Sequence, residues 1–195
     1  MNSASRNTFS VNGWTLEKLV HHSDIENFDC GDRDLNEYFR VDSVAYQSEL
    51  MTQTYCFHQE GDRQCNSLAL VDFCNDSISR NFIPNRDKRK INYRKRGYHS
   101  YPALKITRLG VHVEAHGKNI GSTLLYMIKL FFLFDNRSGC RFLTVDAYRN
   151  AQGFYEKNLF VPMLAQEDDN PATPTVAMFF DLKSVDVRNS MNENR

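Results

Sequence analysis

The pattern of apolar and polar residues along the chain predicts a mixture of strands and helices. Short segments that alternate in polarity, or that run apolar and are rich in β-branched and aromatic residues, predict strands. Six segments have this character: 14–20, 54–58, 67–74, 101–113, 141–147 and 175–182. Apolar residues at helical spacing predict helices over 34–48, 123–134 and 152–158. This order favours an α+β fold with a strand, a helix and a strand at its centre.

The connections between these segments predict a single domain over residues 1–195 with a core at about 14–182. A polar, Gly-containing connection at 60–66 joins two predicted strands and favours an antiparallel hairpin. From about 80 to 100 the pattern dissolves into a long basic loop, and residues 183–195 form a polar tail. The first ten residues are expected to fray as well.

Composition excludes some classes of function. Lys plus Arg equals Asp plus Glu at 24 each, so net charge gives no argument for a nucleic acid or a membrane as partner. The longest apolar stretch, 124–134, includes Lys129 and is too short to span a bilayer, and no leader-like segment opens the chain. The sequence therefore predicts a cytoplasmic protein without a membrane partner.

The cysteines argue against both disulfides and metal. They are odd in number, widely spread and never paired with another Cys or a His at ligand spacing, so we expect reduced thiols and no metal site. The five are Cys30, Cys56, Cys65, Cys74 and Cys140.

The segment HGKNIGS at residues 116–122 carries the most specific chemistry, because it leads from a predicted strand into a predicted helix. Such a helix start presents unpaired backbone N–H groups and the positive end of the helix dipole, which together bind anions. Gly117 and Gly121 allow close backbone approach, Lys118 adds charge, and Asn119 tolerates a left-handed conformation. A diphosphate fits such a loop. The alternative is a strand-to-helix turn that binds nothing.

Two ordered motifs, RLGVHVEAHGKNIGSTLL and VDAYRNAQGFYEKNLF, resemble the GNAT superfamily of acetyl-CoA-dependent N-acetyltransferases. FDCGDRDLNEYF at 28–39, the late Tyr155 and the terminal MFFDL resemble its TacT-type branch, which includes aminoacyl-tRNA-acetylating toxins paired with small antitoxins. The resemblance covers about 14–182. It implies a central mixed, largely antiparallel twisted sheet of six to seven strands flanked by about four helices.

The resemblance also implies roles for individual residues. Tyr155 matches the general acid that protonates the departing thiolate, although a core aromatic packed on Phe154 is the alternative. Asn150 would bind the cofactor arm or cap the following helix. The remaining cofactor-binding positions are Leu109 and Val111, which act through their backbones, and His116, Gly117, Lys118, Asn119, Gly121 and Ser122. No general base is evident, although His112, Glu114 and Asp146 are near the presumed site in the sequence.

The function expected from the resemblance is direct transfer of an acetyl group from acetyl-CoA to a primary amine. An aminoacyl-tRNA is one candidate acceptor, because seven Lys or Arg between Arg86 and Arg96 face a single acid, Asp87, with Tyr93 and Tyr98 available for stacking. The alternative for this basic segment is a solvated loop. A small antitoxin is a further implied partner, and a homodimer stays open.

A different class of function is a degenerate GNAT-fold binding or assembly module with weak or no affinity for CoA. His116 and Asn119 stand where the family's loop usually has Gln or Arg and then Gly. Leu159 stands where Gly usually follows the FYEK helix. These three differences motivate the alternative.

Overall fold

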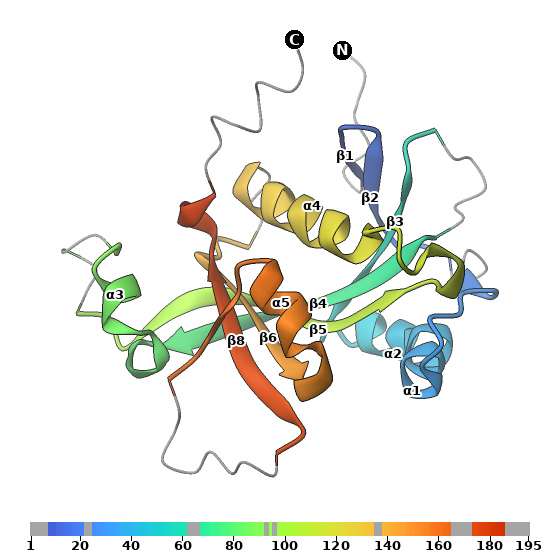
Figure 1. Ribbon diagram of the computed structural model, residues 1–195. Coiled ribbons are helices and arrows are strands. Elements are labelled where there is room, and N and C mark those ends of the chain that lie inside the picture. The colour runs from blue at the N-terminus through green and yellow to red at the C-terminus, as the bar shows by residue number, and fades with distance from the viewer. Residues whose placement is uncertain are drawn as a thin grey trace. The chain divides into compact units, whose positions relative to one another are not determined.

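The computed structural model describes residues 8–21, 25–61, 67–91, 94, 97–134, 138–164 and 173–185. Their strands form a sheet in the order β1-β2-β3-β4-β5-β6-β8-β7 (Figure 1). The strands are β1 (Thr8–Val11), β2 (Trp14–Lys18), β3 (Gln53–Gln59), β4 (Ala69–Ser79), β5 (Ser100–Val111), β6 (Phe142–Tyr148), β7 (Val161–Pro162) and β8 (Thr175–Asp181). Antiparallel pairing joins β1 to β2, β2 to β3, β3 to β4, β6 to β8 and β7 to β8.

This sheet confirms the α+β class and all six predicted strands, and it corrects their number. The prediction of six to seven strands was too low, because the eight include β1 and β7, which are only four and two residues long. β1 lies where the sequence predicted a frayed end, and it pairs with β2 through the turn at Asn12 and Gly13. Segments this short have too few residues to show a period of two.

Three helical segments follow the predicted pattern, and a fourth lies where a loop was predicted. The helix expected over 34–48 is a continuous run that contains a π-helical segment at Tyr38–Asp42. The pattern of apolar residues does not predict this segment. If this run is counted as one, the described residues contain four α-helical segments. The helices are α1 (Arg33–Glu37) and α2 (Ser43–Ser48) on either side of the π segment, α3 (Asn85–Lys88), α4 (Ile120–Phe134) and α5 (Gln152–Lys157). Helix α3 lies within the predicted basic loop.

The chain divides into two compact units, each of which is described by itself. The first unit comprises residues 1–74 and 106–131, and the second comprises 75–105 and 132–195. Strands β4 and β5 each contribute residues to both units. The single domain expected over 1–195 stays a prediction, and residues 186–195 of the expected polar tail lie outside the described residues.

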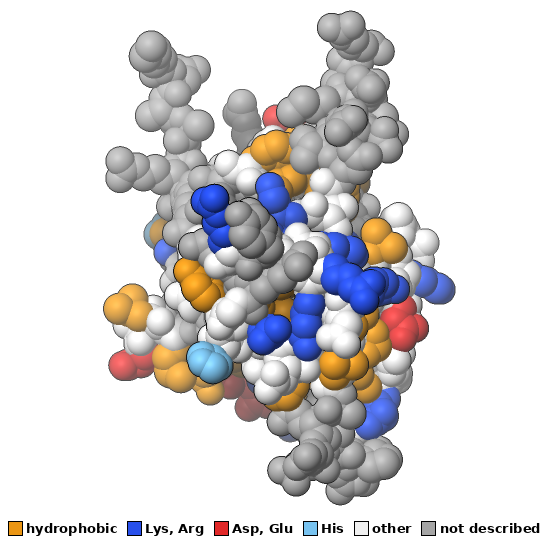
Figure 2. Space-filling model, turned by 90° about the vertical axis from the view of Figure 1, so that its left-hand side faces the viewer, with side chains coloured by type: hydrophobic (Ala, Val, Ile, Leu, Met, Phe, Trp, Pro, Cys, Tyr) orange, Lys and Arg blue, Asp and Glu red, His pale blue; other side chains and the backbone are white. Residues whose placement is uncertain are grey.

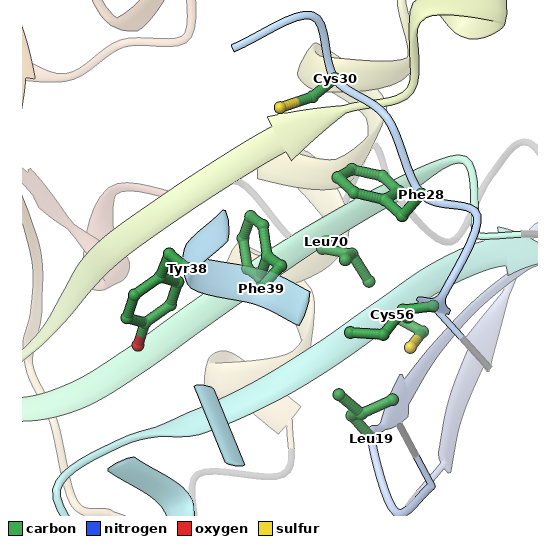
Figure 3. Close-up of a cluster of buried hydrophobic side chains, with 8 residues drawn as sticks. Leu19, Phe28, Cys30, Tyr38, Phe39, Cys56 and Leu70 are labelled. Carbon is green, nitrogen blue, oxygen red and sulfur yellow. The ribbon is translucent and has the colours of Figure 1, made fainter. Parts of the chain in front are cut away.

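The first unit has a core in which the π segment packs on the sheet. Tyr38 and Phe39 are both buried there, and Figure 3 shows their rings among side chains from β3, from β4 and from the segment between β2 and α1. The cluster consists of Leu19, Ile25, Phe28, Cys30, Tyr38, Phe39, Cys56 and Leu70. A Cβ atom at Gly110 of β5 would lie 3.3 Å from both Cys30 and Phe39, so glycine is what allows this close packing.

The second unit has its own apolar cluster, which combines residues near α3 with residues of β4, β5, β6 and β8. It consists of Ile78, Ile83, Ile91, Tyr101, Ala103, Phe142 and Phe179. A two-pronged ion pair stands at one end of these strands. Arg141 donates from Nε to Asp181 Oδ1 at 2.7 Å and from a second guanidinium nitrogen to Oδ2 at 2.8 Å. Such paired hydrogen bonds fix the geometry of two strand ends as well as their charge.

Two helices end in Schellman motifs with leucine at the left-handed position. After α2, Leu50 has φ +59° and Met51 N–H donates to the Tyr46 carbonyl at 2.9 Å. After α5, Leu159 has φ +66° and Phe160 N–H donates to the Tyr155 carbonyl at 3.0 Å. Each helix therefore ends in a conformation in which glycine is usual at this position. Leucine in its place adds backbone strain.

Replacing either leucine by glycine should stabilise the fold. Leu50 and Leu159 are 87% and 70% exposed, so Leu50→Gly and Leu159→Gly lose little packing. Each should raise the free energy of unfolding by about 0.5–1 kcal/mol, because relief of left-handed strain exceeds the entropy that glycine adds to the unfolded chain. Urea unfolding measures this. As a matched control, Val41→Gly at an exposed helical position should lower stability.

Helix α4 is apolar and largely buried, and it contains a lysine. Lys129 is 6% exposed, and burial lowers its pKa to about 8. In the described part of the chain, no helix is long and apolar enough to cross a membrane. A buried ammonium costs stability, because folding removes it from water.

Lys129→Met should therefore stabilise the protein at neutral pH. Because the folded pKa lies below the unfolded value of 10.5, the penalty is full below about pH 8 and fades as pH rises toward 10.5. We expect a gain of about 2 kcal/mol at pH 7 that shrinks by pH 10. Thermal unfolding across this pH range measures it. The half-buried Lys18, substituted in the same way, should give no comparable gain at pH 7.

Candidate functional site

The predicted anion-binding loop lies in the first unit, between β5 and α4. A 3-10 turn at Val113–Ala115 follows the strand, and the turn at 116–119 leads into α4. Ala115 and Ile120 are buried at the two ends of this turn, whereas residues 116–119 are exposed. The hydrophobic ends fix the loop in place while its polar middle faces solvent.

Backbone conformation in the loop is close to what the sequence indicated. Gly117 and Asn119 have φ of +74° and +60°, so the left-handed conformation expected at Asn119 is present. A Cβ atom at Gly117 would meet nothing within 4 Å, which leaves this backbone open. Gly121 and Ser122 differ from the expectation, since they lie in the first turn of α4 and not in the loop.

Helix α4 begins directly at the end of the exposed loop. The Asn119 carbonyl accepts hydrogen bonds from the backbone N–H and the hydroxyl of Thr123, both at 3.1 Å, so the helix begins directly after Asn119. The N–H groups of a first helical turn have no acceptor within the helix and lie at its positive end. Lys118 adds an exposed cation beside them.

His116 takes part in holding the loop together. Its Nε2 lies 2.8 Å from the Val111 carbonyl oxygen, which only accepts, so Nε2 carries the proton and donates. The ring is therefore tied to the end of β5. An anion bound at a helix start is held mainly by backbone N–H groups, so a histidine at this position does not conflict with the predicted anion site.

A small pocket lies beside the loop in the same unit. Its volume is about 190 Å³, below the size of pockets that enclose whole drug-sized ligands. The lining residues are Trp14, Gln59, Leu68, Ala115, Lys118 and Ile120. Trp14, at one wall of the pocket, stacks on Phe57 with ring centroids 5.1 Å apart.

The end of β5 is covered by the loop that precedes α1. Val113 N–H donates to the Asp29 carbonyl at 2.8 Å, and His112 N–H donates to the Leu68 carbonyl at 2.9 Å. Leu109 and Val111, the predicted cofactor-binding positions on this strand, are half-buried. Of the base candidates, His112 accepts from Glu114 N–H through Nδ1 at 3.2 Å, so it serves as a turn cap.

Sequence reasoning missed a buried carboxylate beside this strand. Asp72 of β4 is 0% exposed and accepts hydrogen bonds from three hydroxyls. Tyr38 donates to Oδ2 at 2.8 Å, Thr107 donates to Oδ2 at 2.6 Å, and Thr54 donates to Oδ1 at 2.8 Å. An aspartate inside the apolar run LALVDFC is the signal that could have found it, because a buried carboxylate needs hydrogen-bond donors.

Tyr155 lies in the second unit, on α5. It is 7% exposed, and burial raises its pKa to about 12. Its ring is edge-on to Phe154 and Phe160, with centroids 5.1 and 5.4 Å away, and the Phe160 contact belongs to the helix cap at Leu159. No described residue hydrogen-bonds its hydroxyl. The phenol therefore keeps its proton at neutral pH, which a proton donor requires.

Asn150 and Asp146, which the sequence also singled out, lie in the second unit. Asn150 is exposed in the turn before α5, and the N-cap of α5 is Ala151 without a side-chain bond, so Asn150 does not cap this helix. Asp146, which is another of the candidate general bases, forms an ion pair with Lys105.

The basic segment 86–96 is only partly described, because residues 92, 93, 95 and 96 lie outside the described ranges. Its acid, Asp87, is buried on α3 and pairs with Lys90 at 2.7 Å and Arg86 at 3.3 Å. Burial alone would raise the pKa of Asp87, but these two cations outweigh it and hold the pKa below its usual value. Figure 2 shows Lys and Arg side chains gathered on the face that includes α3.

The neutral net charge of the chain hides an uneven division. The described residues of the second unit contain eleven Lys or Arg and five Asp or Glu, whereas those of the first contain six and eleven. Among the described residues, no group of three His, Cys, Asp or Glu is placed to hold a metal ion. The cysteines at 30, 56, 74 and 140 are thiols, and Cys65 lies outside the described residues.

Comparisons with known proteins show the fold. No family model matches the chain, and no curated protein matches it by sequence. A structure of AtaT complexed with acetyl-methionyl-tRNAfMet has a TM-score of 0.71 and 23% identity, covering 90% of this chain and 99% of that one. A tyrosine-to-phenylalanine mutant of KacT gives 0.70 and 20%, covering 88% and 96%. AtaTR bound with AcCoA gives 0.66 and 23%, covering 92% and 99%. The chain has the GNAT fold of these structures.

The environment of Tyr155 predicts a loss of stability in alkali. Because its folded pKa of about 12 exceeds the unfolded value of 10, its contribution is complete below pH 10 and is lost as pH rises to 12. Wild type should lose about 2 kcal/mol more than Tyr155→Phe between pH 9 and 11.5. Urea unfolding from pH 9 to 11.5 measures the difference. An exposed tyrosine, in Tyr148→Phe, should leave the wild-type loss unchanged.

Proposed function

We propose that this chain is an acetyl-CoA-dependent N-acetyltransferase that transfers the acetyl group directly to a primary amine. The observation that supports the proposal is the exposed loop with positive φ at Gly117 and Asn119 and a cation at Lys118, which leads directly into the first turn of α4. AtaTR, which is similar in fold, is bound with AcCoA. The diphosphate of CoA would be held by residues 116–122, mostly through backbone N–H groups.

In the proposed reaction the amine nitrogen attacks the thioester carbonyl carbon. A C–N bond forms, the C–S bond breaks, and the negative charge passes through the carbonyl oxygen to the sulfur. Backbone N–H groups of Leu109 and Val111 would stabilise the oxygen. Tyr155 would donate its proton to the CoA thiolate, and the amine would release its own proton to water. Tyrosine-to-phenylalanine mutants are among the similar structures, of KacT and of the AtaT toxin.

For the acceptor we favour the α-amine of an aminoacyl-tRNA. The excess of Lys and Arg in the second unit and the exposed segment around α3 support an RNA partner, because phosphate contacts dominate RNA affinity. AtaT has been seen complexed with acetyl-methionyl-tRNAfMet. A small antitoxin is a further proposed partner, since the AtaT toxin binds the C-terminus of the antitoxin AtaR.

Calorimetric titration with acetyl-CoA tests the cofactor step. We expect binding at micromolar strength, about 8 kcal/mol, for wild type and for the His116→Gln plus Asn119→Gly variant, because the loop binds through its backbone. Binding only in the variant would favour the degenerate binding module. If neither protein binds, the proposed function is wrong.

Steady-state acetylation of aminoacyl-tRNA tests the role of Tyr155. Tyr155→Phe should bind acetyl-CoA as wild type does and lose about 100-fold or more in turnover, because the thiolate then leaves without a proton donor. Tyr148→Phe is the matched control in the same unit and should keep full turnover. A Tyr155→Phe enzyme with wild-type turnover would remove the proposed general acid.

A further inference from the structure

Arg108 of β5 is an exposed cation whose side chain is held in one orientation. A guanidinium nitrogen donates to the Thr107 carbonyl at 2.8 Å, and Cζ lies 4.9 Å from the centroid of the Tyr38 ring. Among the described residues, no carboxylate lies within ion-pair distance of it. The first unit is rich in acids, so an oriented arginine without an acidic partner is unusual there.

The orientation has a rigid support. The Tyr38 hydroxyl donates to the fully buried Asp72, and Thr107, the neighbour of Arg108, donates to the same carboxylate oxygen. The carboxylate thus fixes both the ring against which the guanidinium lies and the residue whose carbonyl it binds. A planar guanidinium held on an aromatic face keeps its remaining N–H donors for a ligand.

The position of Arg108 connects it with the proposed reaction. It directly precedes Leu109 on the strand that would hold the thioester. A guanidinium matches the two oxygens of a phosphate, and its attraction is strongest when no protein carboxylate competes. An anionic group of the acceptor would contact the Arg108 guanidinium next to the proposed site of acetyl transfer.

We propose that Arg108 binds a phosphodiester of the acceptor, and that Tyr38, Thr107 and Asp72 are positioning residues for it. The inference rests on the proposed function and adds a specificity-determining residue to it. The competing explanation is that Arg108 only balances the charge of Asp72 through Tyr38. If Arg108 had only that role, its replacement would lower the stability of the protein and would weaken acetylation of all acceptors equally.

Two acceptors that differ by one phosphodiester test the inference. They are an aminoacyl-adenosine and the same aminoacyl group on cytidylyl-adenosine, both joined through an amide so that they do not hydrolyse. Arg108→Gln should raise KM about 10–100-fold for the phosphodiester acceptor and leave the other unchanged, because one charged contact is lost. Arg108→Lys should recover part of the loss. Arg33→Gln, an exposed arginine of the same unit, is the matched control.

A second pair of acceptors, a dipeptide and its C-terminal amide, tests whether Arg108 binds a carboxylate of the acceptor instead of a phosphate. If Arg108→Gln weakens only the free dipeptide, the phosphodiester assignment is overturned. An equal loss for both nucleotide acceptors with a lower melting temperature would show a structural counter-charge instead.

The positioning role has its own readout. Tyr38→Phe keeps the ring and removes its bond to Asp72, and Thr107→Val removes a second bond. Both should reduce the preference for the phosphodiester acceptor through KM at unchanged kcat. If Asp72→Asn fails to fold, these two variants still decide the question, and unchanged preference in both would remove the positioning role.

Failure of the enzyme proposal can be told apart from failure of this inference. NMR titration with cytidylyl-adenosine and with adenosine, in the presence of CoA, measures the phosphodiester contact without turnover. Binding that needs Arg108 supports the contact even if no amine is acetylated. Equal binding by wild type and Arg108→Gln rejects it even if acetylation proceeds.

Discussion

The buried carboxylate of Asp72 is the constraint on which the first unit depends. Burying a carboxyl group costs stability unless hydrogen bonds replace those that it makes to water. Here three hydroxyls do so, from the π segment, from β3 and from β5. Loss of any one would leave the carboxylate partly unsatisfied, at a cost of about 1–3 kcal/mol. The side chain of Asp72 therefore joins β4, on which it lies, to the π segment, to β3 and to β5.

This constraint explains the π-helical segment. Tyr38 must reach Asp72, while its neighbour Phe39 enters the apolar cluster with Phe28 and Leu70. The wider turn of the π segment places consecutive side chains for both tasks, and such irregular turns are often found at functional sites. Burial raises the pKa of Tyr38, with the nearby Asp72 adding to the effect, so the phenol stays protonated and remains a donor. The same arrangement fixes the surroundings of β5, where Gly110 permits the close approach of Phe39.

The sequence predicted the elements better than the contacts between them. Period and composition located β2 to β6, β8, α4 and α5, because each is long enough to show its pattern. The loop at 116–119 was also predictable, since Gly117 and Asn119 are residues that accept positive φ. The left-handed conformation of Leu50 and Leu159 was not, because leucine itself disfavours the conformation that these helix caps require. The partners of Asp72 are 18, 34 and 35 residues away, beyond any local pattern.

The division of charge separates two ways of holding an anion. The second unit has an excess of cations, which attracts polyanions over distances of about a Debye length and weakens as salt is added. The first unit has an excess of acids and repels them at long range. An anion that binds in the first unit needs short-range groups, and we propose the N–H groups at the start of α4, Lys118 and the guanidinium of Arg108 for this. Fixed donors, unlike diffuse charge, can discriminate between anions by shape. Selectivity for a phosphate-bearing ligand would therefore reside in the first unit, although the net charge of the chain favours neither.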